Sequence, residues 1–215
     1  AFSSKGIGTV AGGNGSGSAL NQIKPLGIFV DSSGNIYVAE AGNNRITKWL
    51  PGATSGTVVA GGNGAGSGNN QFEWAPGFDV HLDSSGNIYI ADTGNSRIMK
   101  WEPDATSGTV FALKKARYIH IDLLDNIYIS EIDSHKVTKW TPGSTSGTSV
   151  VELTNPTGIF VDNSGNIYVS DYLNNRIQKL QISTEIIIPA GSTTGTVTFT
   201  GIDDTTDEAD ETIIV

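Results

Sequence analysis

Short apolar runs separated by polar turns recur four times along the chain. Each copy has an apolar run that ends at an aspartate, a polar turn, and a second apolar run that begins Asn-Ile-Tyr. The copies are Asp31–Tyr37, Asp83–Tyr89, Asp122–Tyr128 and Asp162–Tyr168. Runs of this length, bounded by Gly, Asn and Ser, predict strands joined in hairpins. The aspartates are 52, 39 and 40 residues apart, and a repeat of about 40–50 residues built from short strands is typical of a β-propeller blade.

Each repeat predicts a four-stranded blade. In the first copy the strands are expected at 27–30, 35–39, 45–49 and 58–60. The turn between the first two strands needs a residue with positive φ, which glycine adopts without strain. Three copies have glycine there, at Gly34, Gly86 and Gly165, and the third copy has Asp125, one of the few side chains that tolerate this conformation. The chain is therefore predicted to be all-β.

An acid ends the second strand of every copy, and a base begins the third strand five residues later. The four pairs are Glu40/Arg45, Asp92/Arg97, Glu131/Lys136 and Asp171/Arg176. A catalytic pair is rarely repeated in every blade, whereas opposite charges facing each other across strands stabilise a sheet. We therefore expect structural ion pairs. The tryptophans that end the third strand, Trp49, Trp101 and Trp140, are expected to pack in the core.

Residues 27–49, Gly-Ile-Phe-Val-Asp-Ser-Ser-Gly-Asn-Ile-Tyr-Val-Ala-Glu-Ala-Gly-Asn-Asn-Arg-Ile-Thr-Lys-Trp, resemble an NHL repeat. The resemblance recurs over residues 25–182 and is weakest in the third copy, which has Ser134–Lys136 where the first copy has Asn-Asn-Arg. It implies an NHL-type β-propeller. Proteins of this family are usually six-bladed and bind proteins or RNA, and related propellers include lyases and hydrolases.

The number of blades is open at this stage. Gly6–Gly17 matches Thr57–Gly66, the fourth strand and exit loop of the first blade, which predicts an orphan N-terminal strand. That strand either completes the last blade and closes a ring, or belongs to an earlier blade, so that the chain is a fragment of a six-bladed ring. The fragment interpretation is favoured because six blades need roughly 240 to 260 residues. An incomplete ring would make an oligomer possible.

The pattern changes after Leu180, which divides the chain into a propeller at 1–182 and a tail at 183–215. Residues 185–215 resemble the second half of a Calx-beta domain. In an alternative, Val197–Thr200 is the fourth strand of the last blade and the tail docks there. The tail holds six carboxylates, and the resemblance implies that they bind calcium, a metal that takes six to eight oxygen ligands; a solvated acidic loop is the other interpretation. These residues are Asp203, Asp204, Asp207, Glu208, Asp210 and Glu211.

Two histidines replace an aromatic residue of the repeat. His81 and His120 stand two residues before the repeat aspartate, where the other copies have Phe29 and Phe160. Asp79 shares a strand face with His81 because strand side chains alternate. Asp79, His81 and His120 are therefore a candidate metal site near the central channel, and related amidating lyases offer a zinc analogue. The favoured alternative is that both imidazoles are packed, hydrogen-bonded rings.

Other features are less specific. Trp74 lies in the longest crossover and is either an aromatic platform for a glycan or peptide, or a lid between blades. The glycine-rich segments 12–17 and 61–68 precede no predicted helix, so they are interpreted as flexible crossovers and not as phosphate-binding loops.

Composition limits the function classes. The chain has 215 residues, no cysteine and a net charge of −9, six negative charges of which lie between Asp203 and Glu211. No basic patch suits nucleic acid, and no apolar run approaches the roughly 18 residues of a membrane-spanning helix. An NHL array followed by a Calx-beta segment implies an extracellular or cell-surface protein. We expect a non-catalytic binding or scaffold module that presents loops to a protein or glycan; the alternatives are a metal-dependent lyase or hydrolase at Asp79, His81 and His120, and a passive structural repeat.

Overall fold

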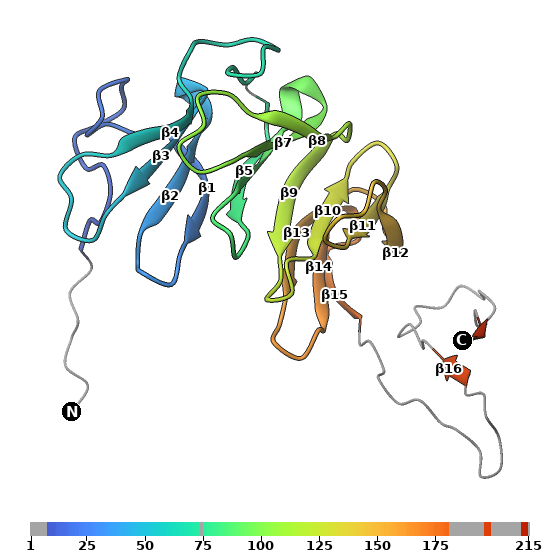
Figure 1. The fold of residues 1–215 in the computed structure, drawn as a ribbon. Coiled ribbons are helices and arrows are strands. Elements are labelled where there is room, and N and C mark those ends of the chain that lie inside the picture. The colour runs from blue at the N-terminus through green and yellow to red at the C-terminus, as the bar shows by residue number, and fades with distance from the viewer. Residues whose placement is uncertain (1–7, 74, 181–195, 199–211, 215) are drawn as a thin grey trace, which may run out of the picture.

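The computed structural model describes residues 8–73 and 75–180, and the backbone of two short strands at 196–198 and 212–214. The described chain is all-β apart from three single-turn 3-10 helices. Its sheets follow one another in sequence order in an arc of propeller blades, with the first blade at one end and the last at the other (Figure 1). The predicted fold class is confirmed.

The first three blades each have four antiparallel strands in sequence order. Blade 1 comprises β1 (Pro25–Val30), β2 (Ile36–Glu40), β3 (Arg45–Trp49) and β4 (Thr57–Gly61). Blade 2 comprises β5 (Phe78–Leu82), β6 (Ile88–Asp92), β7 (Arg97–Trp101) and β8 (Thr109–Ala112). Blade 3 comprises β9 (Ala116–Ile121), β10 (Ile127–Glu131), β11 (Lys136–Trp140) and β12 (Thr148–Glu152). The 3-10 helices η1 (Ala41–Asn43), η2 (Thr93–Asn95) and η3 (Tyr172–Asn174) join the second and third strands of blades 1, 2 and 4.

Blade 4 has three described strands, β13 (Pro156–Val161), β14 (Ile167–Asp171) and β15 (Arg176–Leu180). In the tail, β16 (Thr196–Thr198) pairs antiparallel with β17 (Thr212–Ile214). This differs from the alternative in which residues 197–200 complete blade 4, because the backbone groups of β16 are paired within the tail. The orphan strand also differs from expectation, since residues 8–24 contain no strand.

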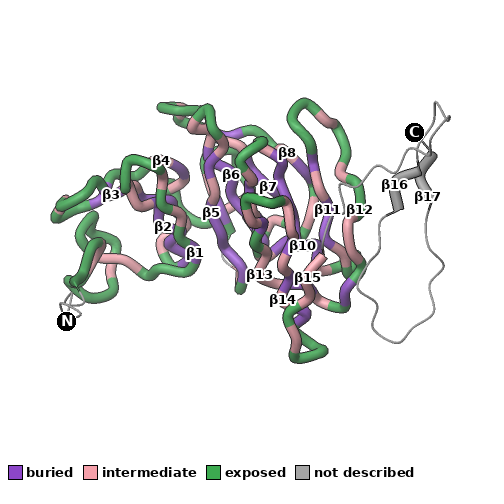
Figure 2. The backbone as a smooth tube through the Cα atoms, turned by 90° about the horizontal axis from the view of Figure 1, so that it is seen from below, coloured by how far each residue is buried: buried purple, intermediate pink, exposed green. Residues whose placement is uncertain are grey.

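The core lies between blades. The face of blade 1 that carries Tyr37, Ala39 and Ile46 packs on the face of blade 2 that carries Val80, Leu82 and Ile90. Blades 2 and 3 and blades 3 and 4 meet in the same way. Buried residues accordingly concentrate on the strands of the middle blades (Figure 2). The expected packing of Trp49, Trp101 and Trp140 is confirmed, because all three are buried.

The repeat aspartate organises the hairpin turn of its blade. In blade 1, Asp31 Oδ1 accepts hydrogen bonds from the backbone N–H groups of Ser33 and Asn35, and Oδ2 accepts one from Asn35 Nδ2. The same bonds form around Asp83, Asp122 and Asp162. The turn explains why the Asp and Asn of the phrase recur together.

Asp125 occupies the turn position that is glycine in the other blades, and it has φ 58°, as the sequence predicts. Its carboxylate also joins two blades, because it accepts hydrogen bonds from the backbone N–H and the hydroxyl of Ser84 in the turn of blade 2.

Three of the four predicted acid–base pairs form, and the fourth does not. Glu40/Arg45, Asp92/Arg97 and Asp171/Arg176 pair at 3.0, 2.7 and 2.8 Å. In blade 3 the predicted partner Lys136 is wrong, because Glu131 pairs with Lys114 at 3.0 Å. Lys114 belongs to the crossover that leads into blade 3, and its ammonium reaches the carboxylate from the preceding chain segment.

Two of the same arginines also hold the crossover segments that contain or follow the glycine-rich stretches. Arg45 donates to the carbonyl oxygens of Ser18, Ala19 and Gln22. Arg97 donates in the same way to the carbonyl oxygens of Ser67, Gly68 and Gln71. Each guanidinium thus neutralises a buried acid and satisfies the backbone of a loop that lacks strand partners.

The described residues form no helix with the length and apolarity needed to span a bilayer.

Candidate functional site

The first candidate site is the set of inner-strand rings that the sequence singled out. Four rings, one from each blade, contact one another in order: Phe29 to His81 at 4.3 Å between centroids, His81 to His120 at 5.0 Å, and His120 to Phe160 at 5.3 Å. The register explains this, because all four rings occupy the same position on the innermost strand of successive blades. The structure therefore brings His81 and His120 together.

Neither imidazole is disposed to carry a proton at neutral pH. Burial lowers the pKa of His81 to about 3, and the neighbouring His120 is the second cause of the shift. Burial also lowers the pKa of His120. His81 Nδ1 is buried and has no hydrogen-bond partner in the described structure. These properties fit packed neutral rings, although the hydrogen bond expected of a packed imidazole is missing at this nitrogen.

The Asp79 carboxyl is hydrogen-bonded to the backbone of a neighbouring blade. Its Oδ2 accepts a hydrogen bond from the backbone N–H of Ile119 in blade 3 at 3.1 Å. A Cβ on Gly27 of blade 1 would collide with its Oδ1, so the carboxyl lies against the backbones of both neighbouring blades. Burial raises the pKa of Asp79 to about 7. Since an unpaired buried charge is costly, burial favours the protonated, uncharged form of this carboxyl.

In the described structure the three side chains are not arranged as a set of zinc ligands. Among the described residues, no group of three His, Cys, Asp or Glu side chains is placed to hold a metal ion. A tetrahedral site needs ligands that converge on one point, but the Asp79 carboxyl is hydrogen-bonded to backbone and the two imidazoles contact each other edge to face, with 61° between their planes. The metal hypothesis stays a prediction for this set.

The other sequence candidates lie outside the described residues. They are Trp74, Asp203, Asp204, Asp207, Glu208, Asp210 and Glu211. Calcium binding by the acidic stretch therefore stays a prediction.

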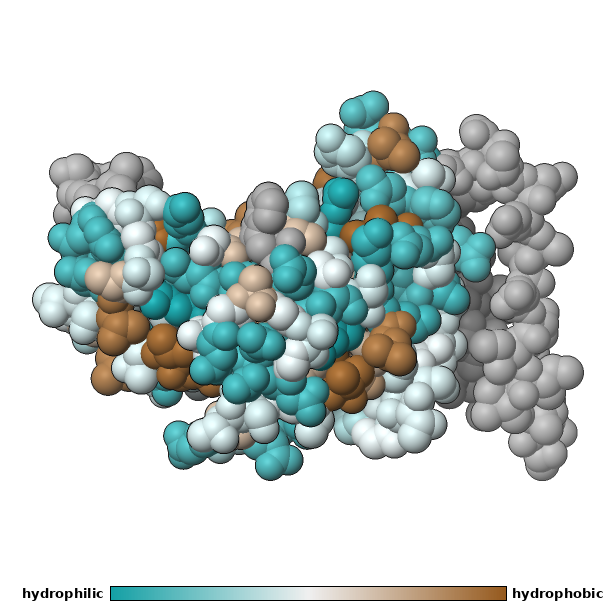
Figure 3. Space-filling view, turned by 90° about the horizontal axis from the view of Figure 1, so that it is seen from above, coloured by the Kyte–Doolittle hydropathy of each residue, from teal (hydrophilic) through white to brown (hydrophobic). Residues whose placement is uncertain are grey.

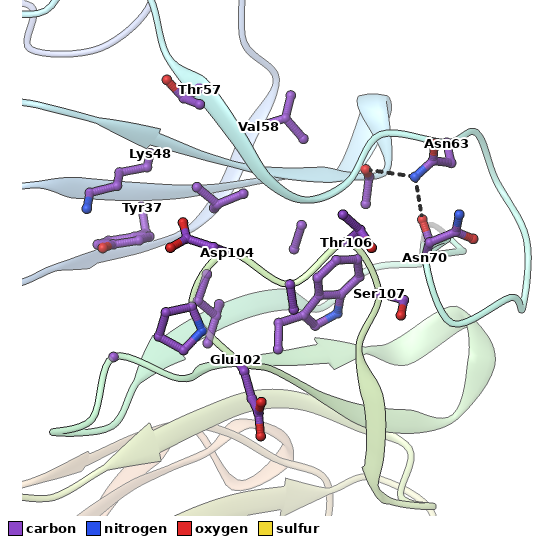
Figure 4. A pocket seen from close by; sticks show the side chains of 18 of the residues that line it. Tyr37, Lys48, Thr57, Val58, Asn63, Asn70, Glu102, Asp104, Thr106 and Ser107 are labelled. Carbon is purple, nitrogen blue, oxygen red and sulfur yellow. Dashed lines mark hydrogen bonds between the residues drawn. The ribbon is translucent and has the colours of Figure 1, made fainter.

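The second candidate site is a groove of about 900 Å³ between blades 1 and 2, which sequence reasoning missed. Tyr37, Lys48, Thr57 and Val58 of blade 1 face the turn between β7 and β8 of blade 2 across the groove (Figure 4). At one end Asn63 Nδ2 donates to the carbonyl of Asn70, which ties the glycine-rich crossover together. The lining comes from segments up to 70 residues apart, so no local motif marked it.

The groove has an apolar floor and a polar rim. Ala60, Ile88 and Trp101 form buried parts of the lining. Lys48 Nζ lies 5.4 Å from the centre of the Tyr37 ring. Glu102 and Asp104 contribute carboxylates from the blade 2 turn, where blade 1 has Leu50 and Gly52.

Trp101, in the wall of the groove, differs in its hydrogen bonding from the equivalent tryptophans of blades 1 and 3. Trp49 and Trp140 each donate from Nε1 to a threonine two residues before them. Blade 2 has Met99 at that position, and Trp101 Nε1 is buried without a partner in the described structure. Comparison of the copies could have found this difference; its position in the groove wall needed the tertiary structure.

Comparison with known proteins supports the repeat. Two segments of the chain, residues 23–49 and 153–180, match the NHL repeat model. No curated protein matches the chain.

Solved structures show the same fold. A streptogramin B lyase structure is 15% identical with a TM-score of 0.57, covering 87% of this chain and 64% of that one. Two virginiamycin B lyase structures from Staphylococcus aureus are also similar. A catalytically inactive H270A variant with quinupristin is 18% identical (TM-score 0.57, covering 80% of this chain and 58% of that one), and a selenomethionine form is 16% identical (TM-score 0.56, covering 84% and 61%).

The chain thus spans about three fifths of the length of these lyases. At this identity the similarity concerns the β-propeller fold.

Proposed function

We propose that the propeller is a non-catalytic binding or scaffold module of a larger extracellular protein, and that it presents its loops to a protein or glycan partner. The groove between blades 1 and 2 is the observation that supports this proposal. It combines a concave shape, an apolar floor and a rim of hydroxyl, amide and charged groups, the usual composition of a recognition site. In the ring set, burial lowers the pKa of both His81 and His120, which favours neutral packed imidazoles.

The test is a screen of the purified chain against a glycan array and a displayed peptide library, followed by titration of the best binder. Thr57→Trp should fill the groove and weaken binding at least tenfold, since Thr57 is exposed and lines it. Thr148→Trp is the matched control, because Thr148 begins β12 at the equivalent position of blade 3, outside the groove. Equal affinity of the two variants for the binder would refute a function of the groove.

A metal-dependent lyase or hydrolase at Asp79, His81 and His120 is the second candidate. The contact between the two imidazoles favours it, together with the lyases among proteins of the same fold. Metal analysis of the purified chain separates the candidates. Stoichiometric zinc that is lost in His81→Phe would support the enzyme; a metal-free protein, or full metal content in His81→Phe, would count against it. If neither a ligand nor a metal is found, the passive structural repeat remains.

A further inference from the structure

The two ends of the blade array expose apolar positions that are buried or half-buried wherever one blade packs on the next. Exposed apolar residues are common on protein surfaces and do not by themselves mark an interface. The surface in Figure 3 is mainly hydrophilic, with apolar side chains in separate groups. The internal repeat provides a control, since the exposure of a side chain can be compared with that of its equivalents in the other blades.

One end is the face of blade 4 that points away from blade 3. Ile177 is 66% exposed there, whereas the equivalent Ile46, Ile98 and Val137 are all 0% exposed. Each of these three belongs to a core cluster shared with the following blade. Phe160 is exposed in the same way, whereas Phe29, its equivalent in blade 1, packs against the core and contacts His81 of blade 2.

The other end is the face of blade 1 that points away from blade 2. Ile28 is 64% exposed, while the equivalent Val80 and Ile119 are 0% and 3% exposed. Val30 is also exposed, and its equivalents in blades 2, 3 and 4 are buried. In those blades the positions are covered by the preceding blade.

These two faces are the two halves of an interface that the molecule already builds three times. We propose that a second copy of this chain packs head to tail, with the Phe160 and Ile177 face of one copy on the Ile28 and Val30 face of the other. The ring series Phe29, His81, His120, Phe160 would continue across the junction, from Phe160 of one copy to Phe29 of the next. The second copy is the occupant that continuity favours, because it carries the matching face with apolar side chains at the equivalent strand positions.

Head-to-tail packing uses two different surfaces, so the assembly is a closed ring only if the rotation from each copy to the next brings the last copy back to the first. The described residues of two copies hold eight blades, within the roughly four to eight that propellers use. The two faces lie at opposite ends of the arc (Figure 1), so a single copy does not bring them together in the described structure. This inference concerns assembly and stands independently of the ligand proposed above.

The experiment measures mass in solution, by light scattering and sedimentation velocity, from about 1 to 100 µM, a range that detects micromolar association. The wild-type chain should reach twice its 22.5 kDa monomer mass. Ile28→Asp and Ile177→Asp each block one face and should remain monomeric, with association at least about tenfold weaker, as for loss of a packed apolar contact. Both side chains are mostly exposed in the single copy, so the fold should survive, which circular dichroism checks.

Mixing the two variants gives the decisive result. Each retains one intact face, and the two intact faces are complementary, so an equimolar mixture should form a heterodimer that neither variant forms alone. Leu113→Asp is the control, because Leu113 is 78% exposed but lies in the crossover between blades 2 and 3; it should associate like wild type. A monomeric wild type, dimers of both single variants, or a mixture that stays monomeric would each overturn the proposal. If a variant is unfolded, Val30→Asp and Phe160→Asp replace the pair.

Discussion

Asp79→Asn should change how the stability of the protein depends on pH. The Asp79 carboxyl is buried against the backbones of Gly27 and Ile119, and burial raises its pKa from 3.8 to about 7. The folded state therefore binds a proton that the unfolded state releases above about pH 4. Between about pH 4 and 7 this group lowers the free energy of unfolding as pH rises, and the loss is complete above the folded pKa.

The size of the effect follows from the shift. A change of about three pKa units corresponds to on the order of 4 kcal/mol, at about 1.4 kcal/mol per unit. Asparagine retains an oxygen that can accept the Ile119 hydrogen bond and carries no charge. The variant should therefore resemble wild type near pH 4 and exceed it by up to this amount near pH 8.

The assay is urea unfolding followed by tryptophan fluorescence from pH 4 to 8. The histidines act in the opposite direction, because their lowered pKa values make the folded state lose stability as pH falls below about 6.5. The difference between variant and wild type cancels that contribution. Asp133→Asn is the control, since its carboxylate is largely exposed. A difference between Asp79→Asn and wild type that is constant across this range would refute the argument.

Three further predictions concern the repeat and the tail. Arg45→Ala should cost about 3–5 kcal/mol of stability, because it leaves Glu40 buried without its cation and frees three loop carbonyls; Lys136→Ala should cost far less in the same melts, and equal costs would contradict the assigned pairs. Thr47→Val should cost about 1–3 kcal/mol of stability, since Trp49 Nε1 and Glu40 Oε1 both lose their hydrogen-bond partner. Thr148→Val is the exposed control, and equal thermal melting of the two variants would count against a stabilising role of these two hydrogen bonds. Calcium titrated into the whole chain should give heat that disappears when Asp203 and Asp204 become Asn, whereas no heat at millimolar calcium would remove the calcium site.

The internal repeats also show where individual blades depart from a common plan. Blades 1 and 3 use a chain of hydrogen bonds from Trp through Thr to Glu. Blade 2 has the shorter Asp92 and an apolar Met99, so the indole of Trp101 loses its partner at the wall of the groove.

Much of the fold could be read from the sequence because each blade is locally encoded. The Asp-to-Asn turn, the positive φ at Asp125 and the alternation within each strand depend on neighbours a few residues away. The pairing of Glu40 with Arg45 was also predictable, since the two ends of a short turn face each other in the sheet. Alternation likewise placed the rings of His81 and His120 at equivalent positions.

What the tertiary structure decided depends on which blades face each other. Glu131 pairs with Lys114, which the crossover between blades 2 and 3 brings to the acid, and not with Lys136, its neighbour in the strand register. Asp79 bonds to Ile119 rather than joining the imidazoles, because a backbone N–H from the next blade lies within reach and Gly27 leaves room for the carboxyl. The groove and the two open end faces exist only between blades, where residues far apart in sequence meet. A repeat unit specifies its own strands, but the contacts of its faces are set by the blade that lies beside it.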